Sequence, residues 1–119
     1  MLRILLVEDE PDIAAVASAV LEDAGHHVTI AADGKEGLDI ALQERPELII
    51  TDFMMPRLTG LEMIHRLREA GFIGPIVLST SVPEAHLPHD RRHYDAYLGK
   101  PYGIRELIAV AEALRKSLD

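Results

Sequence analysis

The sequence predicts an α/β fold in which an open, doubly wound parallel sheet of five strands carries helices on both faces. Short apolar runs alternate with segments of helical periodicity along the chain, and this alternation is typical of parallel strands joined by helical crossovers. Two of the runs, Leu2–Val7 and Pro75–Leu78, are apolar without alternation, as expected for strands buried on both faces. Five such units are too few to close an eight-stranded barrel, so the sheet is expected to stay open.

The first half of the chain contains two strand–helix units. Leu2–Val7 is a run of mostly branched aliphatic residues, and Pro11 suits the first turn of the following helix because its missing N–H is not needed there. Apolar residues at helical spacing then continue to Gly25, which ends the helix. His27–Ala31 is expected as a short second strand and Gly34–Glu44 as a second helix.

The second half continues the same alternation. Three further apolar runs are expected as strands: Glu47–Thr51, Pro75–Ser79 and Asp95–Gly99. Two further segments carry apolar residues three or four positions apart and are expected as helices: Leu58–Ala70, which Gly71 ends, and Gly103–Leu118. Each expected strand is thus followed by a helix, with one exception.

The exception is Ser81–Tyr94, where a fourth crossover helix is expected to be short or distorted. The segment contains Pro83, Pro88 and few apolar residues, and a proline inside a helix removes a hydrogen bond and clashes with the preceding turn. It also contains three histidines that would share one face of a helix: His86, His89 and His93. Because Pro88 interrupts that helix and no thiolate is available, solvated surface histidines are expected there rather than a zinc site.

Composition limits the classes of function. The chain has 119 residues, 20 Asp and Glu against 12 Lys and Arg, and a formal net charge of −8. This length suits one domain over residues 1–119, and the acidic surplus disfavours direct binding to nucleic acid or to an anionic membrane. Without cysteine there is no disulfide, thiol nucleophile or thiolate metal site. No apolar run is long enough to span a membrane and no signal peptide is visible, so a soluble cytoplasmic domain is expected.

Reactive side chains follow four of the expected strands at the point where each strand ends. Glu8 and Asp9 follow the first strand, Asp52 the third, Thr80 the fourth and Lys100 the fifth. The carboxyl ends of parallel strands meet at one edge of an open sheet, and ligands bind at that edge. Three carboxylates gathered there would repel one another, and a hard divalent cation such as Mg²⁺ relieves the repulsion.

Such a cluster contains the groups that phosphoryl transfer needs. Mg²⁺ held by few carboxylates usually shares its remaining positions with a phosphate, and Lys100 and Thr80 can bond phosphoryl oxygens. A carboxylate such as Asp52 can itself attack phosphorus and form an acyl phosphate. In the alternative interpretation, Glu8–Glu10 merely favour the positive N-terminus of the next helix, and Asp52 and Lys100 are ordinary surface residues. The predicted convergence of these residues on one edge of the sheet favours a functional site over these separate roles.

These residues resemble the receiver domain of two-component response regulators, and the resemblance runs from Leu2 to Leu118. Leu5–Glu10 looks like the strand of this family that ends in an acidic pair. Residues 52–60 (DFMMPRLTG) are similar to the phosphoacceptor motif D-x-x-M-P-x-x-x-G. Thr80, Lys100-Pro101 and a tyrosine three residues before the lysine complete the pattern. In this order and spacing the set is highly specific.

The resemblance implies the flavodoxin-like strand order 2-1-3-4-5 and a site at which Asp52 accepts a phosphoryl group. The donor would be the phosphohistidine of a sensor histidine kinase or of a phosphotransfer protein. Mg²⁺ would be bound by Asp9, Asp52 and the backbone carbonyl of Met54, with Glu8 acting through water. Glu8 is a departure, because relatives often carry Asp at that position.

The resemblance also implies how the site would switch. Thr80 and Tyr97 would act as a pair, in which the hydroxyl turns toward the phosphoryl group and the ring turns inward. Lys100 would pair with a phosphoryl oxygen, and the Lys100-Pro101 peptide bond is expected to be cis, as in relatives. Thr59 stands where relatives often carry an acidic residue, and a turn or cap is expected there.

A phosphorylation-controlled switch, rather than a turnover enzyme, is therefore the leading interpretation. A receiver-like module that works through partner contact alone is the alternative, although the five reactive side chains are all present. A Mg²⁺-dependent phosphohydrolase is a third interpretation, which Met54 disfavours because it stands where a general acid would be needed. The output partner is unknown from the sequence, and the flanks of the stripe Ile104–Leu114 are the expected interface of any homodimer.

Overall fold

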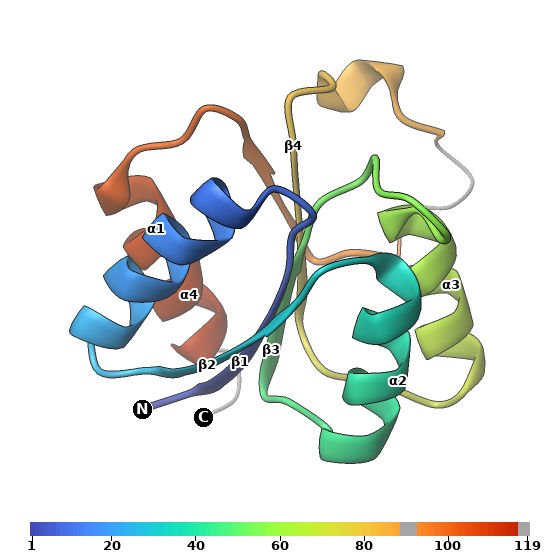
Figure 1. Ribbon diagram of the computed structural model, residues 1–119, viewed down its shortest axis with the longest axis horizontal. Helices are drawn as coiled ribbons and strands as arrows, with labels where there is room; N and C mark the ends of the chain where they lie inside the picture. Colours follow the sequence, from blue (N-terminus) through green and yellow to red (C-terminus); the bar gives the residue numbers. More distant parts are fainter. Residues whose placement is uncertain (89–92, 117–119) are drawn as a thin grey trace.

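The computed structural model describes residues 1–88 and 93–116 and has the expected α/β architecture (Figure 1). Five parallel strands form one sheet in the order β2-β1-β3-β4-β5, which confirms the predicted order. The strands are β1 (Arg3–Val7), β2 (His27–Ala31), β3 (Leu48–Thr51), β4 (Ile76–Thr80) and β5 (Ala96–Gly99). The helices are α1 (Pro11–Asp23), α2 (Gly34–Glu44), α3 (Gly60–Glu69), α4 (Ile104–Lys116) and the short 3₁₀ helix η1 (Glu84–His86).

The sheet is covered on both faces, by α1 and α4 on one side and by α2 and α3 on the other (Figure 1). Successive side chains of β1 alternate between two apolar cores: Ile4 and Leu6 pack on the α1–α4 side, whereas Leu5 and Val7 pack on the α2–α3 side. Since both faces of the strand are buried, a continuous apolar run is required. The unbroken hydrophobicity of Leu2–Val7 in the sequence therefore has a direct structural cause.

Helix ends follow the local chemistry of the sequence. Gly25 and Gly71 follow α1 and α3 with φ angles of +99° and +92°, a left-handed conformation that favours glycine. The start of α3 is set by a capping box: Thr59 Oγ1 accepts the Glu62 N–H at 3.2 Å, and Glu62 Oε1 accepts the Thr59 N–H at 3.1 Å. Thr59 is thus the expected cap, and α3 begins at Gly60 instead of Leu58 because the cap residue lies outside the helix.

The chain between β4 and β5 lacks a regular crossover helix in its described part, as the prolines predict. After Pro83 it forms only the 3₁₀ turn η1. Leu87 anchors this stretch because its side chain is only 2% exposed and joins the core on the α2–α3 side. Tyr94, just before β5, donates a hydrogen bond from its hydroxyl to Glu84 Oε2 at 2.9 Å. Of the three histidines considered as a helical face, His89 lies outside the described residues.

The carboxyl ends of the strands share one edge of the sheet, at the top of Figure 1. Beyond β5 at this edge, the Lys100-Pro101 peptide bond is cis, as the resemblance implied. No helix within residues 1–88 and 93–116 has the length and apolar character needed to cross a membrane. The edge formed by the strand ends is where the reactive residues of the sequence are found.

Candidate functional site

Two neighbouring strands bring the three carboxylates together. Val7 of β1 is paired with Thr51 of β3, so Glu8 and Asp52 come next on adjacent strands. Their backbones stay in the sheet, because the Glu8 N–H donates to the Ala31 carbonyl and the Asp52 N–H donates to the Val7 carbonyl, each at 3.0 Å. The parallel register therefore places the two carboxylates beside each other before any side-chain contact is considered.

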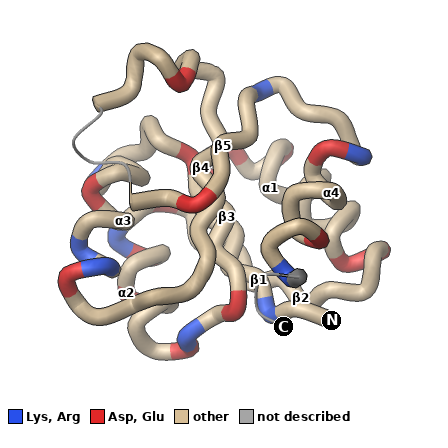
Figure 2. The backbone as a smooth tube through the Cα atoms, turned by 180° about the vertical axis from the view of Figure 1, so that it is seen from behind, with Lys and Arg blue, Asp and Glu red and all other residues tan. Residues whose placement is uncertain are grey.

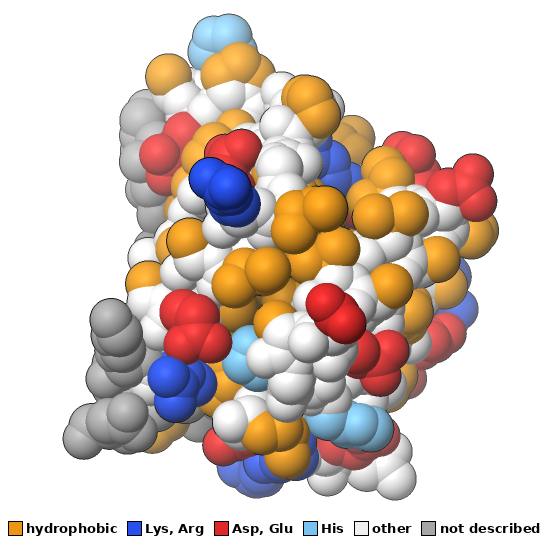
Figure 3. Space-filling view, turned by 90° about the vertical axis from the view of Figure 1, so that its left-hand side faces the viewer, with side chains coloured by type: hydrophobic (Ala, Val, Ile, Leu, Met, Phe, Trp, Pro, Cys, Tyr) orange, Lys and Arg blue, Asp and Glu red, His pale blue; other side chains and the backbone are white. Residues whose placement is uncertain are grey.

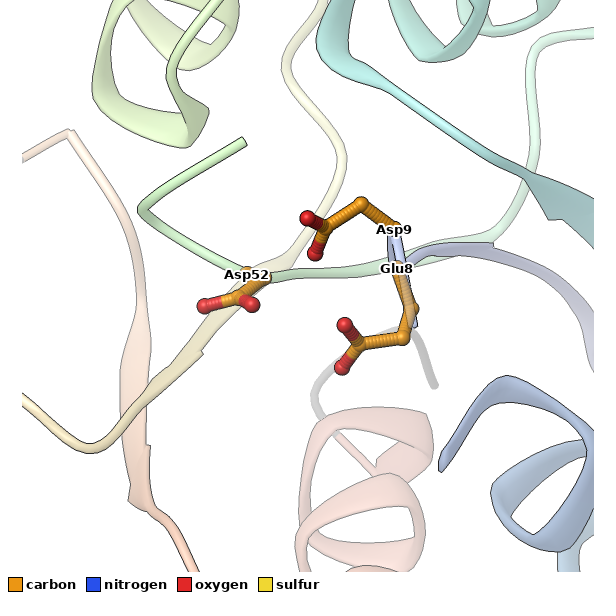
Figure 4. A group of neighbouring side chains, drawn as sticks. All are labelled: Glu8, Asp9 and Asp52. Carbon is orange, nitrogen blue, oxygen red and sulfur yellow. The ribbon is translucent and has the colours of Figure 1, made fainter. Parts of the chain in front are cut away.

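The carboxylates of Glu8, Asp9 and Asp52 face a common space (Figure 4). One oxygen from each residue lies within 4.8 Å of an oxygen from the other two. Glu8 and Asp52 are only 5% and 9% exposed, so most of their charge is out of contact with bulk water. The convergence that the sequence predicted for these three residues is present, and their separation is suited to shared binding of a cation.

Lys100 offsets part of the negative charge of this cluster. Its Nζ lies 2.5 Å from Glu8 Oε1 and 3.1 Å from Asp52 Oδ2, so one ammonium bridges two carboxylates from different strands. Burial alone would lower the pKa of Lys100, but the hydrogen bonds to Glu8 and Asp52 outweigh burial and raise it. Lys100 therefore stays protonated, and the cluster retains a fixed positive charge.

For Glu8, the effect of burial on the pKa exceeds that of its hydrogen bonds. Burial raises the pKa of its carboxyl, and the negative charge of Asp52 acts in the same direction. The hydrogen bonds from Lys100 and from the Glu10 N–H lower the pKa but do not cancel the effect of burial. The ionised form of Glu8 is thus held at a cost in this structure, as is common for groups at functional sites.

The backbone that follows β3 fixes the direction of the Asp52 carboxylate. Asp52 Oδ1 accepts the Phe53 N–H at 2.7 Å, and the Phe53 carbonyl accepts the Gly60 N–H at 2.7 Å. A Cβ at Gly60 would lie 1.9 Å from the Asp52 carbonyl oxygen, so only glycine fits at this close approach. The motif D-x-x-M-P-x-x-x-G therefore spans a loop whose two ends, Asp52 and Gly60, are in contact.

Thr80 and Tyr97 both contact Val82. Thr80, at the end of β4, is 2% exposed, and its Oγ1 accepts the Val82 N–H at 3.2 Å. The Tyr97 hydroxyl donates to the Val82 carbonyl at 2.6 Å, and its half-buried ring packs against the core on the α2–α3 side. The two expected switch residues are therefore linked through the backbone of one residue in the chain that follows β4.

Met54 is the remaining residue of the expected site. It lies two residues after Asp52 in the loop, and its side chain is 61% exposed. Its side chain therefore plays no part in the acidic cluster, and the metal-binding role of its backbone carbonyl stays a prediction. The structure brings together Glu8, Asp9, Asp52 and Lys100, and it places Thr80 at the same edge of the sheet.

One surface beside the cluster was not anticipated from the sequence. An open groove of about 560 Å³ separates α1 from the chain that follows Lys100. The residues that line it are Glu10, Asp12, Ile13, Val16, Ala17, Ser81, Lys100, Pro101 and Tyr102. Apolar side chains gather at the centre of this face of the molecule (Figure 3). Val16, an apolar residue within α1, is 63% exposed.

Comparison with known proteins agrees with the fold. Residues 4–112 match the family model of the response regulator receiver domain. The "uncharacterized transcriptional regulatory protein YkoG" of Bacillus subtilis is 42% identical over 119 residues, which cover 97% of this chain and 52% of that protein. "Response regulator MprA" of Mycolicibacterium vanbaalenii is 39% identical over 115 residues, covering 94% and 49%. The chain thus spans about half the length of these curated relatives.

Solved structures with the same fold include two receiver-sized proteins. Chemotaxis response regulator CheY4 of Vibrio cholerae is 31% identical, with a TM-score of 0.88 and coverage of 96% of this chain and 98% of that one. Response regulator TrrA of Thermotoga maritima, solved in complex with Mg²⁺-BeF, is 29% identical with a TM-score of 0.88, covering 96% and 99%. The family match over most of the chain, the strand order and the acidic edge agree: this chain belongs to the response regulator receiver domains of two-component systems.

Proposed function

We propose that this receiver domain is a phosphorylation-controlled switch in which Asp52 accepts a phosphoryl group in a Mg²⁺-dependent reaction. The donor is the phosphohistidine of a sensor histidine kinase or of a phosphotransfer protein. The observation that carries the proposal is the position of the Asp52 carboxylate, which lies beside the carboxylates of Glu8 and Asp9 and 3.1 Å from the ammonium of Lys100. A nucleophile, a cation site and a fixed positive charge at one point are what phosphoryl transfer requires.

The donor set fits Mg²⁺. Three carboxylates with oxygens within 4.8 Å of one another offer hard ligands, and Mg²⁺ prefers such ligands together with several waters. In this proposal Asp9, Asp52 and the Met54 carbonyl bind the ion directly, and Glu8 binds it through water. The bound ion supplies positive charge that offsets the negative charge of the phosphoryl oxygens.

The chain's own residues account for the transfer step. A carboxylate oxygen of Asp52 attacks the phosphorus, the bond from phosphorus to the donor imidazole breaks, and its electron pair returns to the imidazole nitrogen. An acyl phosphate forms on Asp52. The Phe53 N–H, which bonds Oδ1, keeps the carboxylate oriented for attack. Lys100, now shared between Glu8 and Asp52, is close enough to transfer one of its hydrogen bonds to a phosphoryl oxygen.

Switching follows from the contacts of Val82. When the Thr80 hydroxyl turns toward the phosphoryl group, the Val82 N–H loses its present acceptor. The Tyr97 hydroxyl is bonded to the carbonyl of the same residue, so a shift of this backbone changes the position of the tyrosine. We infer that phosphorylation of Asp52 is transmitted in this way to the chain after β4 and to β5.

The alternative function, a module that signals by partner contact without phosphorylation, has less support. Such a module has no need of a buried carboxylate cluster held by a single lysine, which is costly to maintain. We also infer that the domain is not a turnover enzyme, because Met54 supplies no general acid beside Asp52. Lys and Arg positions are interspersed with Asp and Glu positions along the described chain (Figure 2). This distribution supports a domain that does not itself bind nucleic acid.

The test is labelling with a small phosphodonor. Incubation of the protein with acetyl phosphate and Mg²⁺ should add one phosphoryl group, measured by intact mass. Asp52→Asn should remove the label, whereas Glu10→Gln, a change at an exposed neighbouring acid, should be labelled like the parent. Full labelling of Asp52→Asn would show that the phosphoacceptor has been assigned to the wrong residue.

A further inference from the structure

Two histidines from distant parts of the sequence meet on the surface of α3. The imidazole rings of His65, on α3, and His93, just before β5, have centroids 5.9 Å apart and are tilted by 38°. Both residues are exposed. One helical turn after His65, Glu69 places its Oε1 3.3 Å from the Nε2 of His65. Two imidazoles and one carboxylate therefore share a surface site well separated in the fold from the acidic cluster.

Arg68 fixes His93 against α3. Its Nε and Nη2 donate to the His93 carbonyl at 3.1 and 2.9 Å, and its Nη1 donates to the Phe72 and Gly74 carbonyls at 3.0 and 2.8 Å. The charge of Arg68 is balanced by Asp95, whose Oδ2 lies 3.1 Å from Nη2. Because His65 lies three residues before Arg68 on the same helix, the anchor that holds the His93 backbone also sets the distance between the two rings.

We propose that His65 and His93 bind a transition-metal ion of the Zn²⁺ type, with Glu69 as the carboxylate that orients His65. Neutral imidazole is a preferred ligand of Zn²⁺, Ni²⁺ and Cu²⁺, whereas an all-carboxylate cluster suits Mg²⁺. Zn–N distances of about 2.0–2.1 Å put the centres of two imidazoles on one ion roughly 5–6 Å apart. The observed separation of 5.9 Å already lies in that range.

Glu69 completes the arrangement as a positioning residue. A metal-binding histidine commonly donates its second ring N–H to a carboxylate, which fixes the ring and increases its basicity. Because Nε2 of His65 lies 3.3 Å from Glu69 Oε1, we assign Nδ1 as the atom that binds the ion. Water completes the coordination, so the affinity is moderate. A bound ion would join α3 to the chain leading into β5, the strand that carries Tyr97.

The experiment is a calorimetric titration of the protein with ZnCl₂ in the presence of excess Mg²⁺, so that the acidic cluster competes little for zinc. The parent should bind one Zn²⁺. His65→Ala and His93→Ala should each weaken binding at least tenfold, and Glu69→Gln should weaken it roughly tenfold, as for other carboxylates behind a ligating histidine. His27→Ala and His86→Ala, which change exposed histidines elsewhere, should bind like the parent.

Ring-proton NMR resonances give a second readout that does not depend on the variants. Zn²⁺ should shift the resonances of His65 and His93 and leave those of His27 unchanged. The proposal is overturned if His93→Ala binds zinc as tightly as the parent, if His86→Ala loses binding equally, or if the parent binds none. Loss of binding in Asp9→Asn instead would assign the zinc to the acidic cluster. None of these outcomes depends on phosphorylation of Asp52.

Discussion

At the residue scale, one lysine pairs with two carboxylates of the acidic cluster. Lys100 bridges Glu8 and Asp52, and all three side chains are largely buried. A buried ion pair is weak evidence for stability, because desolvation offsets much of the attraction. With one ammonium against three carboxylates, the site carries excess negative charge, which is the condition that favours cation binding.

The burial of Glu8 predicts that Glu8→Gln becomes more stable relative to the parent as the pH rises. Burial raises the pKa of Glu8 above its ordinary value of 4.5, so the folded state binds this proton more tightly than the unfolded state does. The stability that protonated Glu8 contributes is full below pH 4.5 and is lost as the pH rises through the raised pKa. Urea unfolding in EDTA at pH 4 and at pH 7 measures the difference in unfolding free energy between Glu8→Gln and the parent.

Glu10→Gln is the matched control, because Glu10 is an adjacent but exposed glutamate. Its difference in unfolding free energy from the parent should change little between the two pH values. If Glu8→Gln loses stability relative to the parent on going from pH 4 to pH 7, then the hydrogen bond from Lys100 dominates over burial and the assigned direction is wrong.

The meeting of three carboxylates at one edge of the sheet was predictable, but the detailed contacts of the cluster were not. Parallel topology alone brings Glu8, Asp9 and Asp52 to one edge, so a sequence with these residues after these strands predicts the cluster. The hydrogen bonds of Lys100 to Glu8 and Asp52 were not anticipated, and its pairing with a phosphoryl oxygen stays a prediction. The close approach of Gly60 to Asp52 depends on the path of a whole loop, which no local pattern specifies.

At the scale of elements, the described chain after β4 contains only the short 3₁₀ helix η1, and we expect it to open at low free energy. Among residues 81–88 only Leu87 is buried, and burying one leucine contributes about 1.5–3 kcal/mol. Amides of residues 81–88 should therefore exchange with solvent much faster than those of α1. Exchange should slow after acetyl phosphate treatment, because Thr80 immediately precedes this stretch. Equal, strong protection in both states would contradict this mechanism.

The groove beside α1 leads to a prediction about the phosphodonor. In the proposed reaction a donor histidine must reach Asp52 at this edge, and the groove, lined largely by apolar residues, borders Lys100. We expect Val16→Asp to reduce phosphotransfer from a histidine kinase at least tenfold, because the new charge would be buried by a docked partner. Labelling by acetyl phosphate should be unchanged, since a small donor needs no docking. The histidine kinase used is one that phosphorylates the parent protein in an in vitro screen.

Ala15→Asp is the control for the same helix. Ala15 is exposed on α1 but does not line the groove, so the added charge there should leave transfer from the kinase close to that of the parent. Equal loss of phosphotransfer in Val16→Asp and Ala15→Asp would show that the effect comes from net charge. Unchanged phosphotransfer in both variants would show that the donor docks elsewhere.

At the scale of the whole molecule, the architecture was predictable because its signals repeat. Five apolar runs separated by helical segments admit few topologies other than an open parallel sheet. Element boundaries were less predictable: Glu47 was expected in the third strand, but it lies outside β3 and uses its carboxylate to accept the Arg3 N–H. The meeting of His65 with His93 was also beyond sequence reasoning, because it depends on how Arg68 holds the backbone of His93, which lies outside any helix or strand.

The proposed Mg²⁺ site predicts that the stability of the whole domain depends on Mg²⁺. An ion that binds only the folded state adds RT ln(1 + [L]/Kd) to the free energy of unfolding, or about 1.4 kcal/mol at ten times Kd. Asp9→Asn should abolish most of this gain, because in the proposed site Asp9 binds the ion directly. Glu8→Gln should keep more of it, since Glu8 acts through water, and Asp12→Asn, a change at an exposed acid of α1, should keep all of it. Urea unfolding with MgCl₂ or with EDTA measures these gains, and equal gains in Asp9→Asn and the parent would mean that the ion binds somewhere other than the edge formed by β1 and β3.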